Sequence, residues 1–583
     1  MLYMKTFAKR FLLMVLAVTC VVSCGPDIDP EGGKEVVTPG QKPENVPSYD
    51  NLAAYDVLKS YVDRTASPDF KLGAAVTVSN FLKMTMEYKT ITANFDEMTA
   101  GNAMKQSSIL RNNGTMDFTQ VRNFINAAEH AGMTVYGHTL AWHSQQSDEY
   151  LNGLIKGQRV DVPAGTGEYV LFETDFNGGS SPFNGWGNNS TRDVTGGVFK
   201  VSNPSVTEND WDVQFARDFD ESFESGQRYR LTFRIKGSSS GTLGAGLQIV
   251  DGYRSAGEFP DIAFDTQWKD VEVECSCTAG GGNRLIFSLG NFAGDIHIDD
   301  FKFSAVGLDY SYSNPTAAEK KQILTDAMDR WIKAMMEVTA TKVSAWDAVN
   351  EAISSRDTDG DGFYELESGA WGSSDNFYWQ DYLGSEDYVR IVIAKARKYY
   401  AEYGGTAPLR LFINDYNLES DWDDNKKLRS LIHWIGIWES DGVTKIDGIG
   451  TQMHISCYAD PNTQKSKENH VVNMLKLMAA TGKLVKISEL DMGYVDRNGN
   501  TVATVDVTDA QLREMADFYD FIVRKYMEIV PPAQQYGITQ WCPTDAPGAL
   551  GTGWRGGEPV GLWDLNYNRK YAYAGFANGL MGD

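Results

Sequence analysis

The chain has 583 residues and a formal net charge of −25 at pH 7. Single hydrophobic cores rarely grow beyond about 300 residues, so the length excludes one compact domain and predicts two or more. The acidic balance argues against nucleic acids and anionic membrane surfaces as binding partners.

The N-terminus has the pattern of an export signal. Basic residues precede an apolar run over 11–22, which is too short to span a bilayer comfortably. The run ends in the letters VVSCG at 21–25, similar to the lipobox of bacterial lipoproteins, in which the cysteine is lipidated. We therefore expect a signal peptide at 1–23 and a lipid anchor on Cys24 at the bacterial outer membrane or cell surface. The alternative is a soluble secreted protein with a leftover cysteine.

Residues 24–48 have the composition of a flexible tether. They are rich in Pro, Gly, Glu and Lys and poor in large apolar residues, so they cannot form a packed core. The acidic residues close behind Cys24 resemble a surface-export signal of some Gram-negative bacteria. Membrane contact is therefore expected only through the lipid anchor.

The cysteines beyond Cys24 do not indicate a fold held together by disulfides or metal ions. They stand at 275, 277, 457 and 542, without metal-ligand spacing. Cys275 and Cys277 lie on one face of a strand and would pair only with strain. We expect no disulfide to hold the fold together.

Two segments, 49–166 and 307–583, share a rhythm in which short apolar strands alternate with helical periods. We expect strands at 70–76, 90–95, 134–140, 343–349, 409–413, 448–452, 484–487 and 538–541, and helices that include 317–338, 388–402, 425–440 and 509–528. Eight strand–helix units predict an α/β fold, a (β/α)8 TIM barrel. A doubly wound sheet is the alternative, but a Gly-rich phosphate loop would be expected after its first strand, and none is present there.

The rhythm breaks over 167–306. Short alternating runs separated by Gly, Ser and Asn clusters replace the amphipathic helices, a pattern typical of an all-β sandwich. This segment follows the third expected strand and precedes the third helix. We therefore predict a barrel interrupted after strand three by an inserted jelly-roll sandwich, which a loop tolerates because domain termini often lie close together.

Polar and aromatic residues stand where the expected strands end. In a TIM barrel these ends gather at one face, where active sites are built. The residues are His138, Trp142, His143 and Gln145; Asn350 and Glu351; Asn414, Asp415 and Tyr416; Gln452 and His454; Glu489 and Asp491; and Trp541 and Asp545, followed by Trp554. One such residue is more often part of a core, but six consecutive strand ends of this kind are hard to explain by packing.

Glu351 and Glu489 are the most informative of these residues. Each ends a short β-branched run. Hydrolysis of a glycosidic bond needs two carboxyl groups, one that holds a proton and one that is ionised and faces the sugar carbon. If the fold brings the pair together, the sequence predicts a polysaccharide-cleaving site that requires no redox cofactor.

The chain resembles the endo-β-1,4-xylanases of glycoside hydrolase family 10. The motifs that carry the resemblance run in family order through both barrel segments: FKLGAAV at 70–76, GHTLAWHSQ at 137–145, WDAVNEA at 346–352, INDYN at 413–417, GTQMH at 450–454 and ISELD at 487–491. Single motifs such as Asn-Asp-Tyr are weak, but the ordered set is very specific.

The resemblance implies a role for each residue of the centre. Glu351 would be the general acid/base and Glu489 the nucleophile of a retaining double displacement. His454 would orient Glu489, and Asp491 would steady the histidine. Asn350 would hold the 2-hydroxyl of the sugar.

The resemblance also implies substrate-binding residues. They are Asn102, Lys105, His138, Trp142, Gln145 and Gln452, with Trp541 and Trp554 over the sugar at the cleavage point. The alternative for each is packing or indirect support. Two positions depart from the family pattern: Gly101 stands where a glutamate is usual, and Cys542 where a glycine is usual.

A structural calcium ion is the one metal that the sequence suggests. Asp357, Asp359 and Asp361 form the first half of a calcium loop, for which a solvated acidic turn is the alternative. The insert opens with FETDF at 172–176, continues with GW at 185–186 and closes with IDDF at 298–301. On these motifs it resembles carbohydrate-binding modules of the family 4/22 type, which would place Glu173 and Asp300 near a second calcium ion.

The same resemblance implies sugar platforms in the insert. Trp186, Trp211 and Tyr253 are the candidates, with burial in the sandwich as the alternative. For the whole chain we expect a monomeric xylanase acting on xylan or xylo-oligosaccharides. A β-1,4- or mixed-linkage glucanase and a non-catalytic glycan-binding surface lipoprotein are the rival readings.

Overall fold

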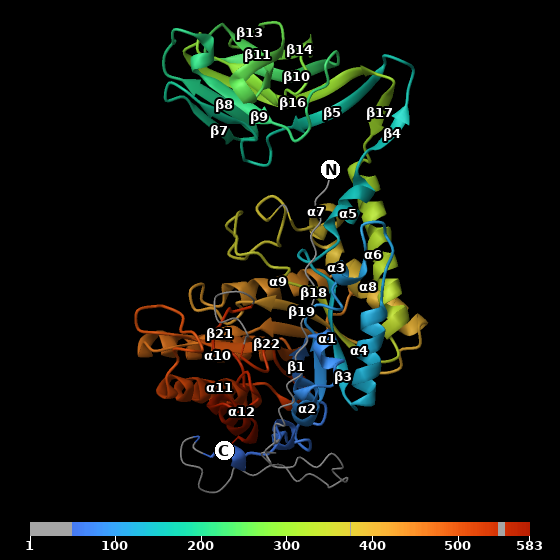
Figure 1. Ribbon diagram of the computed structural model, residues 1–583, viewed down its shortest axis with the longest axis vertical. Coiled ribbons are helices and arrows are strands. Elements are labelled where there is room, and N and C mark those ends of the chain that lie inside the picture. The colour runs from blue at the N-terminus through green and yellow to red at the C-terminus, as the bar shows by residue number, and fades with distance from the viewer. Residues whose placement is uncertain (1–48, 50, 374, 546–553, 583) are drawn as a thin grey trace, which may run out of the picture.

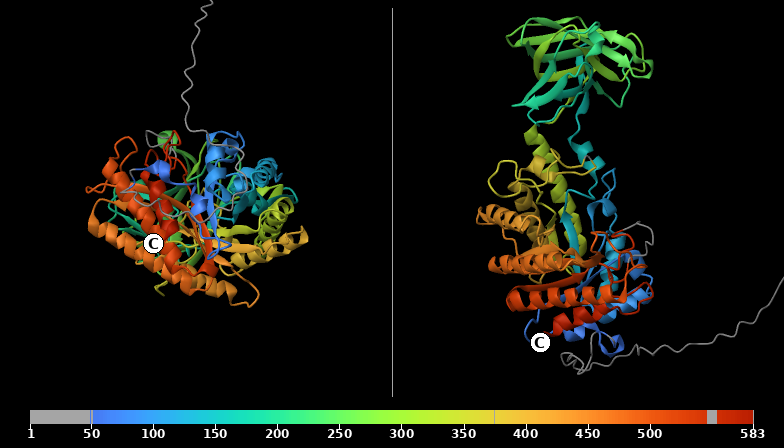
Figure 2. Two further views of the ribbon diagram at one scale, coloured as in Figure 1. Left: turned by 90° about the horizontal axis from the view of Figure 1, so that it is seen from below. Right: turned by 90° about the vertical axis from the view of Figure 1, so that its left-hand side faces the viewer.

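The computed structural model describes residues 49, 51–373, 375–545 and 554–582, and within them it forms two units (Figure 1). An α/β barrel carries an all-β sandwich at one end, and the second view in Figure 2 shows the same two-part arrangement from the side. The expected signal peptide, the lipidated Cys24 and the tether lie outside the described residues. In the described part, no helix is long and apolar enough to cross a membrane.

The barrel is a closed ring of eight parallel strands, as predicted. Its hydrogen-bonded order is β20-β19-β18-β3-β2-β1-β23-β22, and a β20–β22 pairing closes the ring. The strands are β1 (Lys71–Val76), β2 (Glu97–Ala100), β3 (Thr134–Ala141), β18 (Ala345–Asn350), β19 (Arg410–Tyr416), β20 (Gly448–Gln452), β22 (Leu484–Val495) and β23 (Gln535–Gln540).

Helices surround the ring, and the longer ones cover its outside (Figure 1). They are α1 (Val78–Phe81), α2 (Met86–Asn94), α3 (Gln106–Ile109), α4 (Thr119–His130), α5 (Asp148–Ile155), α6 (Ala317–Thr339), α7 (Trp379–Leu383), α8 (Asp387–Glu402), α9 (Lys426–Glu439), α10 (Pro461–Ala480), α11 (Asp509–Ile529) and α12 (Tyr571–Met581). Several begin at caps that are visible in the sequence. Thr316 and Thr508, for example, accept hydrogen bonds from backbone N–H groups in the first turns of α6 and α11.

One expected strand was wrong. Residues 90–95 lie in helix α2 and its cap, and the second barrel strand is β2. The β-branched residues near Ile91 have the pattern of a strand although they are helical. The fully buried strand β2 contains Glu97, so its sequence does not have the apolar pattern expected of a buried strand. The charge is tolerated because the carboxylate of Glu97 meets the ammonium of Lys486 from β22 at 3.0 Å, and both side chains are almost fully buried.

The sandwich is inserted between β3 and α6, as predicted. The chain leaves through α5 and strand β4 (Gln158–Asp161) and returns through β17 (Tyr310–Ser313). β4 and β17 pair antiparallel, so a two-stranded ribbon joins the units (Figure 1). Because the ribbon lies between the end of a barrel strand and the next long helix, it is rooted on the catalytic side of a TIM barrel.

The sandwich consists of two antiparallel sheets. One contains β5 (Gly167–Thr174), β7 (Thr191–Thr195), β8 (Val198–Asn203), β10 (Arg228–Gly237), β14 (Lys269–Ser276) and β16 (Gly294–Leu308). The other contains β6 (Asn184–Trp186), β9 (Gln214–Asp218), β11 (Gly241–Ile249), β12 (Arg254–Glu258), β13 (Ile262–Phe264) and β15 (Arg284–Ser288).

The core between the two sheets is rich in phenylalanine. The rings of Phe183, Phe199, Phe215 and Phe287 contact one another there. Cys275 and Cys277 are both buried and free. No disulfide joins the described cysteines in this structure.

Candidate active site

Both strands that carry the candidate glutamates are irregular next to them. The register of β18 shifts between Asp347 and Val349 against both neighbouring strands, and that of β22 shifts between Ile487 and Leu490 against β23. A β-bulge redirects the side chains that follow it. The two irregularities lie on strands separated in the ring only by β19 and β20, so the glutamates meet at one mouth of the barrel.

Glu351 follows β18 in a left-handed backbone conformation, with φ of 53°. Its N–H donates to the carbonyl oxygen of Asn414 on β19 at 2.7 Å. Its carboxylate accepts from the side-chain amides of Gln452 at 3.1 Å and Asn350 at 3.3 Å. A conformation that is costly for a residue other than glycine is thus held by three contacts.

Glu489 lies within β22 and is almost fully buried. Its Oε2 is 3.1 Å from Nε2 of His454, and Nδ1 of the same ring is 2.8 Å from Oδ2 of Asp491. Its Oε1 accepts a 3.4 Å hydrogen bond from the amide of Asn414, which also donates to Asn350 at 2.8 Å. Asn350 and Asn414 therefore link the surroundings of the two glutamates.

The His454–Asp491 contact depends on structure that the expected strands did not include. β22 continues past the barrel rim, where it pairs with β21 (His454–Tyr458). In that pairing His454 lies directly opposite Asp491. The expected strand 484–487 stops short because it covers only the part of β22 that belongs to the ring.

The two glutamates have opposite electrostatic surroundings. Burial raises the pKa of Glu351 to about 7, and the negative charges of Asp415 and Glu489 add to this effect. Burial also acts to raise the pKa of Glu489, but the hydrogen bond from His454 and nearby positive charges outweigh it and hold the pKa below its usual value. Below about pH 7 the Glu351 carboxyl group therefore keeps its proton while that of Glu489 is ionised.

His454 provides the charge that makes this difference. Burial acts to lower its pKa, but the contacts with Asp491 and Glu489 raise it to about 10. The ring is therefore an imidazolium that donates to both carboxylates. By contrast, burial lowers the pKa of His143 to about 4.

Asp491 also anchors the segment that carries Trp554 and Arg555, of which sequence reasoning missed Arg555. Its carboxylate accepts from the indole N–H of Trp554 at 2.8 Å and from Arg555 at 3.2 Å. The thiol of Cys542, the residue that departs from the family pattern, lies 3.8 Å from the same carboxylate. Arg555 carried no signal in the sequence because only the fold brings its partners together.

Lys105, Asn102, Trp142 and His138 come from the ends of β2 and β3. The Lys105 ammonium donates to Asn102 at 3.1 Å and lies 5.0 Å from the centre of the Trp142 ring. Burial lowers its pKa, against the attraction of Glu489 and Glu351. His138 contacts Asp347 at 2.9 Å. These residues lie near the two glutamates at one mouth of the barrel, but their expected contacts with sugar stay a prediction.

Three further expected binding residues have different settings. The Trp541 ring lies 5.7 Å from that of His138 and 6.2 Å from that of His454, so it covers the centre. Gln452 is almost fully buried and donates to Glu351, which favours a positioning role over a glycone contact. Gln145 is exposed, and its carbonyl accepts from the N–H of Ser107. At Gly101, a Cβ would meet only a carbonyl oxygen at 3.8 Å, so the backbone leaves room for a side chain to begin there.

The expected aromatic platforms of the insert are exposed and lie on or beside the strands of one sheet. Trp186, Trp211 and Tyr253 are 38%, 61% and 73% exposed. Trp186 ends β6, whereas Trp211 lies in a 3-10 turn before β9 and Tyr253 in a 3-10 turn between β11 and β12, and these strands belong to the β12-β11-β15-β9-β6 sheet. The guanidinium of Arg284 on β15 lies 5.6 Å from the Trp186 ring and senses the charge of Tyr253. Burial in the sandwich core is therefore excluded for all three.

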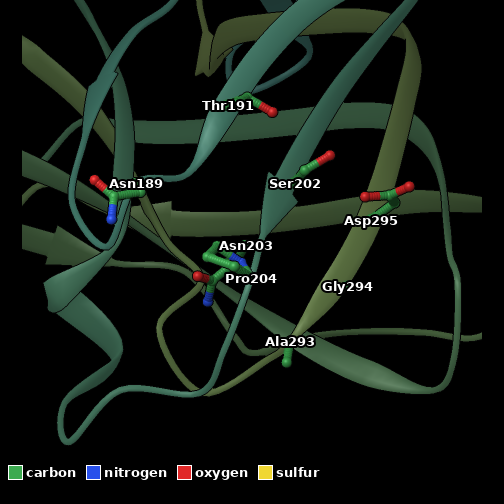
Figure 3. A pocket seen from close by; sticks show the side chains of 8 residues that line it. All are labelled: Asn189, Thr191, Ser202, Asn203, Pro204, Ala293, Gly294 and Asp295. Carbon is green, nitrogen blue, oxygen red and sulfur yellow. The ribbon is translucent and has the colours of Figure 1, made fainter.

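The opposite sheet has a polar hollow of about 510 Å³. Figure 3 shows its lining, which comes from β7, β8, β16 and the adjoining loops: Asn189, Thr191, Ser202, Asn203, Pro204, Ala293, Gly294 and Asp295. It contains no aromatic side chain. Stacking on a sugar ring is therefore possible on the Trp186 sheet but not in this hollow.

The acidic turn after Glu351 brings its three aspartates together. One carboxylate oxygen each from Asp357, Asp359 and Asp361 lies within 4.8 Å of the others, the only such cluster among the described residues. Carboxylate oxygens are the donors that calcium prefers, but the ammonium of Lys426 already lies 2.6 Å from Asp357. A calcium ion at this turn stays a prediction.

The second expected calcium site has a competing partner as well. Asp300 forms a 2.7 Å ion pair with Arg234. Glu173, on the neighbouring strand β5, is exposed. This pair of residues also stays a prediction.

A TIM barrel with a proton-holding and an ionised glutamate at its strand ends has the architecture of the barrel glycoside hydrolases. The profile of glycosyl hydrolase family 10 matches residues 62–167 and 310–579, more than half of the chain. The chain therefore belongs to glycosyl hydrolase family 10. A carbohydrate binding domain matches residues 168–289, within the sandwich.

Curated relatives match part of the chain. Endo-1,4-beta-xylanase A of Cellvibrio japonicus is 28% identical over 288 residues, and endo-1,4-beta-xylanase 2 of Aureobasidium pullulans is 31% identical over 258 residues. The first match covers 47% of this chain and 43% of the relative's own length. The second covers 43% of this chain and 60% of the relative's own length.

Solved structures agree on the fold. Xylanase B from Clostridium stercorarium F9 matches with a TM-score of 0.50 at 16% identity, over 90% of this chain and 100% of that one. Native xylanase10C from Cellvibrio japonicus matches with a TM-score of 0.51 at 19% identity, over 91% of this chain and 73% of that one.

Two histidines of the cleft should titrate in opposite ways. In the protein labelled with ¹⁵N-histidine, NMR should show His454 protonated on both ring nitrogens up to about pH 9 and His143 neutral above about pH 5. The His454 pKa of about 10 exceeds the ordinary 6.5. Its charged form therefore contributes stability that is fully present below about pH 6.5 and is lost as the pH rises through about 10.

The variants His454→Asn and His143→Asn assign the two sets of resonances. A His454 signal that titrates near pH 6.5 would contradict the charged bridge between the two carboxylates.

Proposed function

We propose that the protein is an endo-1,4-β-xylanase that hydrolyses internal bonds of xylan with retention of configuration. The observation that carries the proposal is the opposite perturbation of two glutamates in one cleft: the pKa of Glu351 is raised to about 7, and that of Glu489 is lowered. The first can protonate a leaving oxygen, and the second can attack the anomeric carbon. The names of the relatives favour xylan as the polymer.

The reaction takes two displacements. In the first, Glu489 forms a bond to the anomeric carbon while the glycosidic oxygen leaves with the proton of Glu351. In the second, Glu351 removes a proton from water, and the resulting hydroxyl replaces Glu489 at the anomeric carbon. Glu489 leaves as a carboxylate and Glu351 is again protonated, so two inversions give net retention.

The contacts of the two glutamates suit this cycle. Donation from His454 keeps Glu489 ionised and aimed before attack. When Glu489 becomes a neutral ester, one negative charge beside Glu351 disappears, which lowers the pKa of Glu351 and makes it a base at the step that needs one. Asn350 donates to Glu351 and accepts from Asn414, which also donates to Glu489, and we expect Asn350 to meet the 2-hydroxyl of the sugar.

Removal of the nucleophile should abolish cleavage. Glu489→Ala should lower the rate of reducing-sugar release from xylan by on the order of 10⁴-fold or more, and NMR of the wild-type products should show the β-anomer first. For the wild type, kcat/KM should fall as the pH rises above about 7, because Glu351 then loses its proton. Glu468→Ala, on the outer helix α10, is the matched control and should keep full activity.

Two rival activities would give different results. A β-1,4- or mixed-linkage glucanase would release sugar from glucan as readily as from xylan, since the backbones differ by one hydroxymethyl group. A surface protein that only binds glycans would release none from either. The raised pKa of Glu351 favours catalysis, because a pure binder has no use for a protonated carboxyl group beside an ionised one.

For the sandwich we propose xylan binding on the β12-β11-β15-β9-β6 sheet. Its support is three exposed aromatic side chains on or beside that sheet, two of which, Trp186 and Tyr253, lie near Arg284. Aromatic faces stack on sugar rings, and Arg284, held by Asp218 through two hydrogen bonds, offers a fixed donor group.

Affinity gels containing xylan test this face. In the Glu489→Ala protein, which should not cut the gel, Trp211→Ala and Tyr253→Ala should each weaken retardation, by about 1 kcal/mol or roughly fivefold in Kd. Trp268→Ala, on the opposite sheet, is the control and should not change it. Equal weakening by all three variants, or by none, would assign binding to the barrel cleft or to the other sheet.

We also propose attachment to the bacterial outer membrane or cell surface through Cys24. The support is the sequence pattern around that residue. In cells fed labelled palmitate, the wild-type protein should carry label and sediment with membranes. Cys24→Ser should carry none and stay in the soluble fraction; label that survives the substitution would reject the anchor.

A further inference from the structure

A fully buried ion pair lies behind Glu351. The ammonium of Lys427, in the first turn of α9, is 2.8 Å from Oδ1 of Asp415 on β19, and neither side chain is exposed to solvent. The same ammonium lies 3.3 Å from the centre of the Tyr416 ring. A buried ion pair of this kind contributes little net stability, so its position calls for another explanation.

Asp415 connects this pair to the catalytic segment. Its Oδ2 accepts a 2.9 Å hydrogen bond from the backbone N–H of Ile353, two residues after Glu351, and its Oδ1 accepts from the N–H of Tyr416 at 2.9 Å. The N–H of Glu351 itself donates to Asn414. Two adjacent residues of β19 thus hold both ends of the turn in which Glu351 adopts its left-handed conformation.

We propose that Asp415 and Lys427 are positioning residues for Glu351: Asp415 ties down the turn that aims its carboxyl group and places a negative charge behind it, and Lys427 pairs with that charge. The inference rests on the proposed glycosidase function and deepens it. Two buried residues that do not touch the substrate would then control the pH at which Glu351 loses its proton.

The charges around the pair define what it can do. Glu351 faces Asp415, Glu489 and Lys427, with Lys105 and Tyr416 also within electrostatic reach. The other groups that sense Lys427 are His143, Glu367 and Glu419.

The effect of Asp415 on Glu351 exceeds that of Lys427. After burial, Asp415 is the largest cause of the raised pKa of Glu351, whereas Lys427 opposes the rise more weakly. Burial acts to lower the pKa of Lys427, but Asp415 and the other acids nearby outweigh it and raise that pKa. Loss of the Asp415 charge, alone or together with that of Lys427, should therefore lower the pKa of Glu351.

The pH dependence of kcat/KM for xylotetraose tests the proposal in the full-length protein. In Asp415→Asn the alkaline limb should move to lower pH by about 1 unit. Activity at neutral pH should fall about tenfold on xylotetraose, but less than about threefold on an aryl xylobioside, whose leaving group needs little protonation. Lys427→Arg keeps the charge and should leave the alkaline limb where the wild type has it.

The double variant Asp415→Asn/Lys427→Met leaves no lone buried charge and provides the test if the single variant does not fold. Its alkaline limb should also lie below that of the wild type. The proposal would be overturned if the alkaline limb of the pH profile stays in place or moves to higher pH, or if activity falls equally on both substrates. The ion pair would then have only a structural role. A wild-type protein that cleaves neither substrate would instead reject the proposed function itself.

Discussion

The charged hydrogen bond from His454 to Glu489 is the interaction on which the cleft depends. Two glutamates share a sheltered space, where burial favours the protonated form of both. The imidazolium reverses this preference for Glu489 and leaves it in place for Glu351. The same ring can hold its charge only because Asp491 accepts from its other nitrogen. The proton on His454 therefore gives two chemically identical side chains different forms: Glu351 is a carboxylic acid and Glu489 is a carboxylate.

The rest of the site supports that arrangement from several strands. Asp491 receives donors from Trp554 and Arg555, so the segment after β23 is attached to the same charge. Asn414 and Asn350 bridge β19 and β18 between the carboxylates. The register shifts in β18 and β22 next to the glutamates are consistent with both side chains facing one opening although each strand is part of a regular ring.

Much of this architecture could be predicted from the residues alone. Seven of the eight expected strands overlap barrel strands, because their apolar runs are short and bounded by clear turns. The exception is β2, where Glu97 interrupts the apolar pattern and is compensated by Lys486 from a distant strand. Contacts of that kind have no local signature. Lys427, Arg555 and the β21–β22 extension escaped prediction for the same reason: each acquires its meaning only from partners far away in the chain.

The ribbon of β4 and β17 has a consequence for how the chain folds as it is made. β1 must pair with β23, close to the opposite end of the chain, and β3 must wait for β18 beyond the whole sandwich. The sandwich, by contrast, draws all of its strands from one continuous stretch. During synthesis it can therefore fold first, and its closed ribbon would then hold α5 and α6 side by side before the barrel that they flank is complete.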